Sequence, residues 1–335
     1  MKRIYIVGSL TPNCLEISYQ SAFQQLGYEV RLFDLTPLFK KYTRGKRVGS
    51  LLNTFFPVDS WAKKVNKDLV LDALAFQPHA LLVGGNARVL AGSLAFLKSV
   101  TNVKTVLLWP DPLVNIDRWV LHAAPMYDLV ATFNKASIDV LQRLGFPKAG
   151  WLPFAADKNF HYGECIAGEK PVDISFVGSW RPEREQSLSE ILAAFPGIKM
   201  KILGPDWDRA ADKQLKKFAV AKGVYGKDFI KIVQQSLMNL NVNDAAGYPA
   251  ANMRFFEIPI AGGFQLSSAT PDMYDEFKNY RELLYFSNKQ ELLEAVKYCL
   301  ANREAVQTMA QAMHNKVLNF HTYEKRAAQL IEKIS

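Results

Sequence analysis

The sequence predicts an α/β protein made of two doubly wound halves, each built on a parallel sheet. Short continuous apolar runs end at Gly, Asp, Asn or Pro, and helix-length segments separate these runs. Strands in a parallel sheet show this pattern because helices bury both faces of the sheet. The series of runs pauses at a linker-like stretch, residues 151–171, and then restarts. The restart predicts a second sheet.

In the first half, a strand over residues 3–8 is followed by a helix around residues 15–27 that stops at Gly27. Four more strands are predicted after this pair, at residues 29–35, 79–85, 104–111 and 127–134. The second half repeats the pattern with strands at residues 173–179, 198–205, 236–243, 263–268 and 283–287. A helix over residues 183–195 follows the first of them. We therefore expect one domain over residues 1–155 and a second over residues 170–315.

The bulk composition fits two such domains. The chain has 335 residues, of which 49% are hydrophobic and 22% charged. Its three cysteines are far apart and show no Cys-x-x-Cys spacing, which favours a reducing, cytoplasmic location over a disulfide framework or a zinc site. We expect no signal peptide and no transmembrane helix, because the apolar runs are too short.

Positive charge is concentrated in the first half of the chain. Residues 1–150 carry 18 basic and 10 acidic residues, a net charge of +8, whereas the remaining 23 basic and 22 acidic residues give +1. A local positive field attracts phospholipid surfaces, lipid phosphates or nucleic acid. The same excess is also compatible with an ordinary solubilising surface.

Two segments of the second half have the chemistry of an anion site. In DISFVGSWRPER, residues 173–184, a strand ends at Gly178 and Ser179, and Arg181 and Arg184 stand where a helix begins. Glycine admits a ligand close to the backbone, a helix start offers free N–H groups, and the arginines add charge. A diphosphate fits this junction, although many α/β proteins use such a junction only to reverse the chain.

The second segment is NMRFFEIPIAGGFQL, residues 252–266. Asn252 can cap a helix that places Arg254 and Glu257 on one face and ends at Gly262 and Gly263, with a bend at Pro259. The carboxylate suits two ribose hydroxyls, and the arginine suits a phosphate. The alternative is an internal Arg–Glu pair with ordinary capping.

With these motifs in order, the chain resembles the CgeB-like glycosyltransferases, which are named after a spore maturation protein. The motifs NxRxFExPxxGGFxL, DISFVGSxxPER and LGPxW carry the resemblance together with HTYEKRAAQL, residues 321–330, and it extends from about residue 105 to the C-terminus. The family implies a GT-B fold, two Rossmann-like domains facing a central cleft, with the nucleotide-sugar in the second. It also implies a C-terminal helix, residues 316–335, that packs back toward the N-terminal domain.

The resemblance assigns donor-side roles residue by residue. Glu257 matches the ribose-binding glutamate of the family. The other matching positions lie in the phosphate turn, at Gly178, Ser179, Arg181 and Arg184, and in loops near the nucleobase, at Gly204, Pro205, Tyr225 and Gly226. One position departs from the large retaining GT-B families, which carry a second glutamate eight residues before the ribose glutamate. Pro249 occupies that position here, so the anomeric outcome stays open.

Asp111 is the candidate catalytic base. It follows the strand KTVLLW in WPDP, at the carboxyl end of a first-domain strand, and the family tends to have an acidic residue at this point. A carboxylate there could take the proton of the acceptor hydroxyl. The equal alternative is that Asp111 only begins an Asp-Pro turn, and His122 is a weaker candidate. Asp206-Trp207-Asp208 resembles a metal-binding Asp-x-Asp, but it falls in a nucleotide-side loop, so we expect no metal and no cofactor beyond the nucleotide-sugar co-substrate.

The acceptor side is expected in the first domain. Gly8 ends its first strand, and residues 40–67 interleave basic residues with Trp61 and two phenylalanines. The basic residues that we select there are Lys40, Lys41, Arg44, Lys46 and Arg47. Basic residues around aromatics suit an anionic membrane or a DNA backbone. The alternative is a core of aromatics with a solvated rim of lysines.

The sequence thus predicts a glycosyltransferase that moves a hexose from a nucleotide-sugar, with UDP favoured, to an acceptor hydroxyl. The expected acceptor is a cell-surface glycan or lipid-linked sugar, met by a cytoplasmic protein at the inner membrane face. Two alternatives remain. The first is a DNA glucosyltransferase acting on hydroxymethylated bases, because phage enzymes of that kind share the fold and are basic. The second is a non-catalytic module that binds a nucleotide-sugar.

Overall fold

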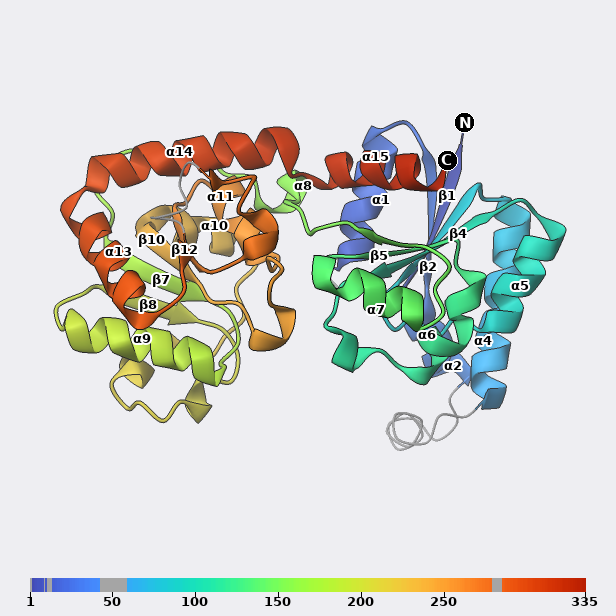
Figure 1. Cartoon of the computed structure of the whole chain (residues 1–335), viewed down its shortest axis with the longest axis horizontal. Helices are drawn as coiled ribbons and strands as arrows, with labels where there is room; N and C mark the ends of the chain where they lie inside the picture. Colours follow the sequence, from blue (N-terminus) through green and yellow to red (C-terminus); the bar gives the residue numbers. More distant parts are fainter. Residues whose placement is uncertain (1, 9, 11–13, 43–58, 279–284) are drawn as a thin grey trace. The chain divides into compact units, whose positions relative to one another are not determined.

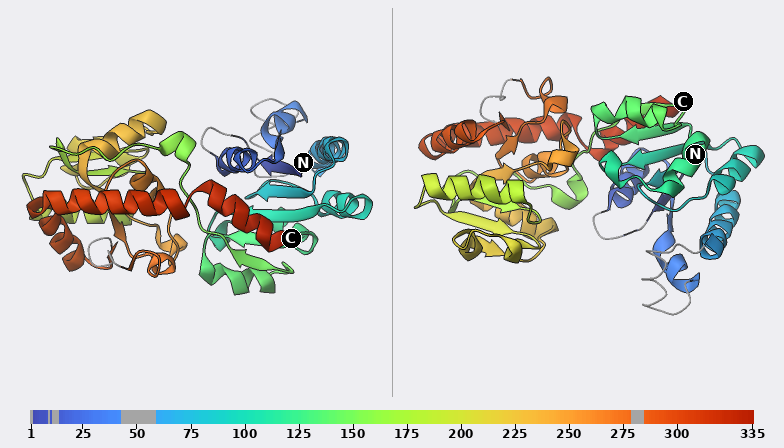
Figure 2. Two further views of the ribbon diagram at one scale, coloured as in Figure 1. Left: turned by 90° about the horizontal axis from the view of Figure 1, so that it is seen from above. Right: turned by 60° about the horizontal axis from the view of Figure 1, so that its bottom comes forward.

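The computed structural model describes residues 2–8, 10, 14–42, 59–278 and 285–335. The chain divides into two compact units. The first comprises Met1–Pro153 with Tyr323–Ser335, and the second comprises Phe154–Thr322. Each unit is built on one six-stranded parallel sheet, with helices on both faces of that sheet (Figures 1 and 2). The two doubly wound halves predicted from the sequence are therefore confirmed.

The sheet of the first unit has the strand order β2-β1-β3-β4-β5-β6. Its strands are β1 (Arg3–Gly8), β2 (Glu29–Asp34), β3 (Ala80–Gly84), β4 (Lys104–Trp109), β5 (Leu129–Thr132) and β6 (Ala149–Trp151). The helices of this unit are α1 (Leu15–Gln25), α2 (Leu35–Tyr42), α4 (Asp59–Phe76), α5 (Ala91–Val100), α6 (Arg118–Ala123), α7 (Ile138–Arg143) and α15 (Tyr323–Ile334).

Alternation along β1 explains how the first sheet buries both faces. Tyr5 and Val7 join a core with residues of α4 and α5, such as Leu69 and Leu94. Ile4 and Ile6 are equally buried, but period 2 turns them to the opposite face. Helix α15 packs against α1 and completes this unit, with the ring of Tyr323 5.3 Å from the ring of Tyr19.

The sheet of the second unit has the order β12-β11-β10-β7-β8-β9. Its strands are β7 (Val172–Val177), β8 (Met200–Leu203), β9 (Ala219–Val220), β10 (Ser236–Asn241), β11 (Gln265–Ser268) and β12 (Tyr285–Phe286). The helices of this unit are α8 (Lys158–His161), α9 (Pro182–Ala194), α10 (Gly226–Gln235), α11 (Arg254–Ile260), α13 (Lys289–Ala301) and α14 (Arg303–Phe320). Helices α10 and α11 share an apolar cluster with Leu203 at the end of β8, whereas α9 packs against α13.

Two strands were not predicted. β6 has three residues, one of them Gly150, and β9 has only two residues. Segments this short hold no apolar run, so only pairing with a neighbouring strand defines them as strands. Among the helices that the structure describes, none combines the length and the hydropathy of a bilayer-spanning helix.

Candidate functional site

The strand order places a crevice at the carboxyl edge of the second sheet. The chain runs from β7 to β8 and β9 on one side and then places β10 on the other side of β7. The loops after β7 and β10 consequently leave in opposite directions, and ligands of doubly wound sheets bind at such a switch point. Behind the crevice, the buried Ser175 hydroxyl of β7 donates to Asn239 Oδ1 of β10 at 2.7 Å.

A close approach of two backbone segments forms the turn after β7. A Cβ at Gly204 would lie 1.9 Å from the carbonyl oxygen of Gly178, so only glycine fits there. The indole N–H of the buried Trp207 donates to that same carbonyl at 2.9 Å, and the Trp180 amide donates to Pro205 O at 2.9 Å. The predicted phosphate turn and the predicted nucleobase loop are thus one interlocked structure.

Arg184 ties together the two loops of the switch point. Its guanidinium donates to Ser179 O at 2.9 Å and to Val242 O at 3.3 Å, and it pairs with Asp244 at 2.9 Å. Its side chain is only 13% exposed, and burial lowers the pKa of Arg184. The side chain of Arg181 is 53% exposed and lies 4.0 Å from Asp244. Arg184 therefore holds the loops, and Arg181 is the accessible cation.

Asn252 positions the start of α11. Its Oδ1 accepts the backbone N–H of Phe255 at 3.1 Å, which is a capping bond at the helix start. Its Nδ2 donates to Oδ1 of Asn241, the last residue of β10, at 2.8 Å. This side chain joins the helix to the carboxyl edge of the sheet, next to the crevice.

Arg254 and Glu257 form an ion pair on one face of α11. Arg254 also donates from Nε to Val177 O, at the end of β7, at 3.2 Å, and its guanidinium lies 4.5 Å from the ring centroid of Phe229. The side chain of Arg254 is 25% exposed and that of Glu257 is 5% exposed. Burial lowers the pKa of Arg254 to about 10, which leaves it charged at neutral pH.

His161 is a member of this site that sequence reasoning missed. Its Nδ1 lies 3.8 Å from Glu257 Oε1 and has no hydrogen-bond partner among the residues that the structure describes. The imidazole makes edge contacts with the rings of Phe160 and Phe229. Burial, together with the nearby Arg254, lowers the pKa of His161 to about 3, so the ring is neutral. Nothing in the sequence spacing relates this linker histidine to a glutamate far along the chain.

Tyr225 and Gly226 stand at the start of α10, on the same side of the sheet as α11. Tyr225 occupies the cap position and is 58% exposed. Gly226 has φ +53°, and a Cβ there would lie 3.4 Å from the ring of Phe160. Burial lowers the pKa of Arg254, and the nearby Tyr225 side chain acts in the opposite direction. An exposed aromatic ring beside a helix start offers a stacking surface and free N–H groups.

Gly262 and Gly263 are not brought together with the other predicted donor residues. They end α11 and precede β11, at the amino ends of the strands, whereas Arg254 starts α11 at the carboxyl edge. Gly262 has φ +82°, and a Cβ at Gly263 would lie 2.3 Å from Val233 Cγ1. Both glycines are therefore required by backbone geometry and packing, and their position gives them no contact with a ligand at the crevice.

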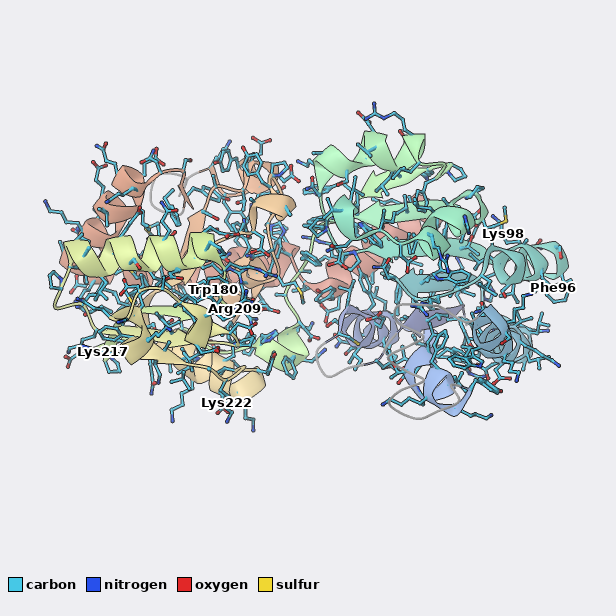
Figure 3. The ribbon with its side chains drawn as sticks, turned by 90° about the horizontal axis from the view of Figure 1, so that it is seen from below. Phe96, Lys98, Trp180, Arg209, Lys217 and Lys222 are labelled. Atoms are coloured by element: carbon cyan, nitrogen blue, oxygen red, sulfur yellow. The ribbon has the colours of Figure 1, made fainter. Side chains whose placement is uncertain are left out.

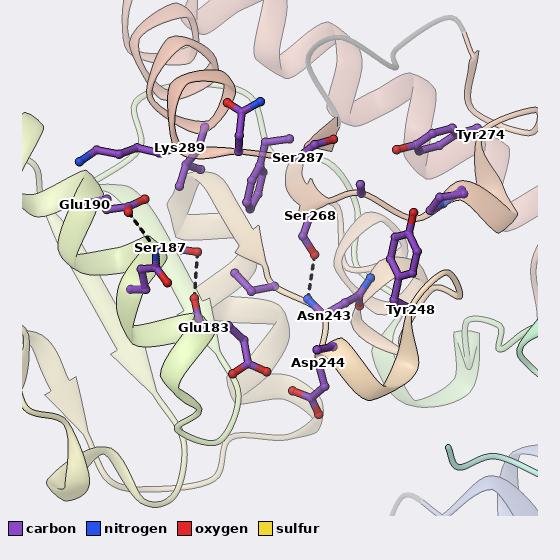
Figure 4. Close-up of a pocket in the computed structure, with 18 residues that line it drawn as sticks. Glu183, Ser187, Glu190, Asn243, Asp244, Tyr248, Ser268, Tyr274, Ser287 and Lys289 are labelled. Atoms are coloured by element: carbon purple, nitrogen blue, oxygen red, sulfur yellow. Dashed lines mark hydrogen bonds between the residues drawn. The ribbon is translucent and has the colours of Figure 1, made fainter. Parts of the chain in front are cut away.

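Asp244 also lines a pocket of about 560 Å³ (Figure 4). Polar and aromatic side chains surround it, among them Glu183, Ser187, Glu190, Asn243, Tyr248, Ser268, Tyr274, Ser287 and Lys289. Carboxylates accept hydrogen bonds from hydroxyl groups and repel phosphate. The pocket is thus chemically suited to a hydroxyl-rich group rather than to an anion.

Asp206-Trp207-Asp208 has a structural role in the turn after β8. Asp206 adopts φ +65°, and Trp207 is 1% exposed. The next residue, Arg209, lies with its guanidinium 4.7 Å from the ring centroid of Trp180 (Figure 3). Within the described ranges, no three His, Cys, Asp or Glu side chains are grouped so that they could hold a metal ion.

The first unit has its own switch point, between β1 and β3. Gly8 ends β1 there. Asp111 follows β4, the strand beside β3, and its carboxyl is half-buried, which raises the pKa of Asp111. A carboxylate with a raised pKa at the carboxyl edge can act as a base near neutral pH.

The basic segment lies on α2 and α4, which pack together. Its described lysines are all exposed: Lys40, Lys41, Lys63, Lys64 and Lys67. Trp61 is only partly exposed. Arg44, Lys46 and Arg47 lie outside the described residues, as do both phenylalanines of the segment.

Residues 182–332 match the family model described as "Glycosyl transferase-like". No curated protein matches the sequence. Many solved structures share the fold, and three of them are compared with this chain. A glycosyltransferase from Rickettsia africae ESF-5 is 13% identical with a TM-score of 0.69, and the match covers 99% of this chain and 97% of that chain.

Sucrose-phosphate synthase from Thermosynechococcus elongatus is 12% identical with a TM-score of 0.66, over 99% of this chain and 98% of that chain. BGT of T4 phage, solved with its UDP-glucose substrate, is 15% identical with a TM-score of 0.58, over the full length of both chains. Identities this low define the fold alone. The predicted GT-B fold class is confirmed, and the family match together with these neighbours supports a glycosyltransferase.

Proposed function

We propose that this protein transfers a hexose from a nucleotide-sugar, with UDP-sugars favoured, to an acceptor hydroxyl, and that it is a glycosyltransferase of the CgeB-like type. The observation that carries the proposal is the Arg254–Glu257 pair beside the glycine turn at the switch point of the second sheet. Both residues lie inside the segment that matches the glycosyl transferase-like model. Two of the similar structures, both of BGT of T4 phage, are complexes with UDP-glucose.

Glu257 would bind the ribose. A carboxylate accepts hydrogen bonds at both oxygens, so it can hold the two neighbouring hydroxyls of a ribose. Arg254 fixes one oxygen of Glu257, and the neutral His161 ring limits movement on the other side. The exposed Tyr225 ring then provides a surface for the nucleobase.

The diphosphate would lie at the glycine turn. Gly178 and Ser179 leave room for it, Arg181 and Arg254 supply positive charge, and Arg184 holds the turn in place. Positive charge at this point stabilises the negative charge that develops on the leaving nucleoside diphosphate. We propose that these groups suffice without a metal ion.

Asp111 would act as the base. The acceptor hydroxyl gives its proton to the Asp111 carboxylate while its oxygen forms a bond to the anomeric carbon. The bond between that carbon and the phosphate oxygen breaks, and the nucleoside diphosphate leaves with the electron pair. The raised pKa of Asp111 makes its carboxylate a stronger base than an exposed aspartate.

For the acceptor we propose a cell-surface glycan or a lipid-linked sugar, met at the inner membrane face. The exposed lysines of α2 and α4 support binding of the acceptor-side unit to an anionic surface such as a membrane. One structural neighbour is described as a lipopolysaccharide outer core galactosyltransferase. The same lysines suit DNA, which keeps a DNA glucosyltransferase as the second candidate.

A donor screen tests the proposal. Thermal unfolding is measured with UDP-glucose and other nucleotide-sugars, and the release of nucleoside diphosphate is followed with each. A donor at about 100 times its Kd stabilises the fold by about 2.7 kcal/mol. Glu257→Ala should abolish the shift, whereas Glu304→Ala, an exposed glutamate on α14, should keep it. The proposal would be refuted if no donor shifted the unfolding temperature of the wild type, or if Glu257→Ala showed the same shift as the wild type.

A further inference from the structure

The carboxyl group of Glu16 occupies the switch point of the first sheet. The chain leaves β1 toward β2 on one side and returns at β3 on the other, and β1 pairs with β3 in the register Val7↔Val83. The next residues, Gly8 and Gly84, are therefore neighbours at the carboxyl edge. Glu16 enters this crevice from the first turn of α1.

Two glycines create the space that the carboxyl occupies. A Cβ at Gly8 would lie 2.2 Å from Glu16 Oε1, and a Cβ at Gly84 would lie 2.1 Å from the same oxygen. Any side chain at either position would displace the carboxyl from the crevice. Adjacent strands that both end in glycine thus hold one acidic group at the point where ligands of such sheets bind.

The burial of Glu16 is unusual for a helix start. A glutamate in the first turn gains from the helix dipole while it is exposed to water, but Glu16 is only 8% exposed. Burial raises the pKa of Glu16 and the carboxylate of Asp34 adds to this effect, whereas hydrogen bonds with the Glu16 backbone and with Cys14 act in the opposite direction. Asp34 itself has a clear structural task, because its Oδ1 accepts the Thr36 and Leu10 amides at 2.9 and 3.3 Å.

We propose that Glu16 binds a hydroxyl group of a neutral sugar acceptor at the β1–β3 crevice, a proposal that rests on the proposed glycosyl transfer. A carboxyl group exchanges hydrogen bonds with hydroxyls, whereas Glu16 and Asp34 together disfavour a phosphate there. Strand β4 lies beside β3, about 5 Å away. A pyranose ring held by Glu16 would thus lie at the end of β3, next to the strand that Asp111, the proposed base, follows. Glu16 would be a positioning residue, and Asp111 would take the proton.

The sequence provides a selective reporter for this crevice. When valine is labelled with ¹³C and glycine with ¹⁵N, only glycines that follow valine give a filtered amide signal. These glycines are Gly8, Gly49, Gly84 and Gly178. Gly8 and Gly84 report on Glu16, and Gly178 reports on the proposed donor turn.

The probes are the neutral methyl pyranosides of glucose, galactose, mannose and N-acetylglucosamine, titrated into the full chain. At least one should shift the Gly8 and Gly84 signals saturably and leave Gly178 in place. Glu16→Gln should weaken that binding about tenfold, as expected for a lost hydrogen bond to a charged group. Glu16→Asp, which withdraws the carboxyl by one methylene, should weaken it less.

Two results would overturn the proposal. Either none of the pyranosides shifts Gly8 and Gly84, or the pyranoside that binds the wild type binds Glu16→Gln just as tightly. An otherwise unchanged set of signals shows that a variant is folded, and Glu16→Asp serves if Glu16→Gln is not. UDP-glucose and other donors are titrated into the same sample, where the Gly178 signal tests the donor site separately.

Discussion

His161 shows how a single buried residue can make the stability of a site depend on pH. Its folded pKa of about 3 lies below the usual histidine value of 6.5. The unfolded chain therefore binds a proton between these values that the folded chain rejects, and stability falls as pH falls from about 6.5 toward 3. The slope is roughly 1.4 kcal/mol per pH unit for one proton.

We predict that His161→Phe reduces this loss of stability. The free energy of unfolding, measured by denaturant at pH 7 and pH 5, should drop by roughly 1 to 2 kcal/mol less in the variant than in the wild type. The comparison between the two proteins cancels the carboxylates that titrate in the same range. His122→Phe, on the exposed α6 histidine, is the matched control and should behave as the wild type. Equal losses in wild type and His161→Phe would contradict the prediction.

Asp111 separates turnover from binding. We predict that Asp111→Asn lowers kcat by 10²- to 10⁴-fold, because an amide cannot take the acceptor proton. The Kd of the donor should stay the same, since Asp111 belongs to the first unit and the proposed donor residues belong to the second. Steady-state kinetics and a donor titration measure the two quantities. A variant that turns over at the wild-type rate would leave Asp111 with only the turn role.

At the scale of secondary-structure elements, the turns after β7 and β8 can pack together only because residue 204 is a glycine. We predict that Gly204→Ala destabilises the second unit by about 2 kcal/mol or more and weakens donor binding, because the new methyl group would meet Gly178 O. Gly197→Ala is the matched control, since a Cβ at Gly197 meets nothing within 4 Å. Thermal unfolding and donor titration of both variants make the comparison, and equal behaviour would contradict the prediction.

The same turns show what the sequence can and cannot predict. Glycines and arginines after an apolar run identified the turn after β7, and apolar runs identified most strands. The lock between Gly204 and Gly178 depends on two backbone segments that meet only in the folded sheet. Glu16 and His161 were missed for the same reason, because each gains its meaning from residues distant in the chain. Gly262 and Gly263 were assigned to the donor site because they belong to the same sequence motif as Arg254. The motif does not show that the two ends of a helix lie at opposite edges of the sheet.

At the scale of the whole molecule, charge is distributed unevenly between the two halves of the chain. The first 150 residues carry +8 and the rest +1. The exposed lysines of α2 and α4 belong to the excess. A positive field of this kind acts on association with an anionic surface and weakens with salt. The charge distribution therefore predicts which kind of surface the protein binds, a property that the geometry of a pocket does not reveal.

We predict that the protein binds vesicles containing phosphatidylserine and that Lys63→Gln/Lys64→Gln/Lys67→Gln weakens this binding. Each lysine near the surface contributes about 1 kcal/mol, so three correspond to a loss of roughly 100-fold. A control variant that neutralises three exposed lysines of the second unit, Lys213, Lys217 and Lys297, should bind like the wild type. Co-sedimentation at low and high salt measures the affinity.

Duplex DNA in the same assay decides between the two proposed acceptors. Retention on DNA at low salt, lost in the Lys63, Lys64 and Lys67 variant and absent on vesicles, would favour the DNA glucosyltransferase. Such an enzyme must also extract its base from the stack, so binding to plain duplex should be weaker than binding to a duplex with a mismatched target base. Binding to vesicles alone would instead agree with a membrane-associated acceptor. The first unit would then have lysines that bind an anionic surface and carboxylates that bind a neutral sugar. A lipid-linked glycan presents both of these ligand chemistries together.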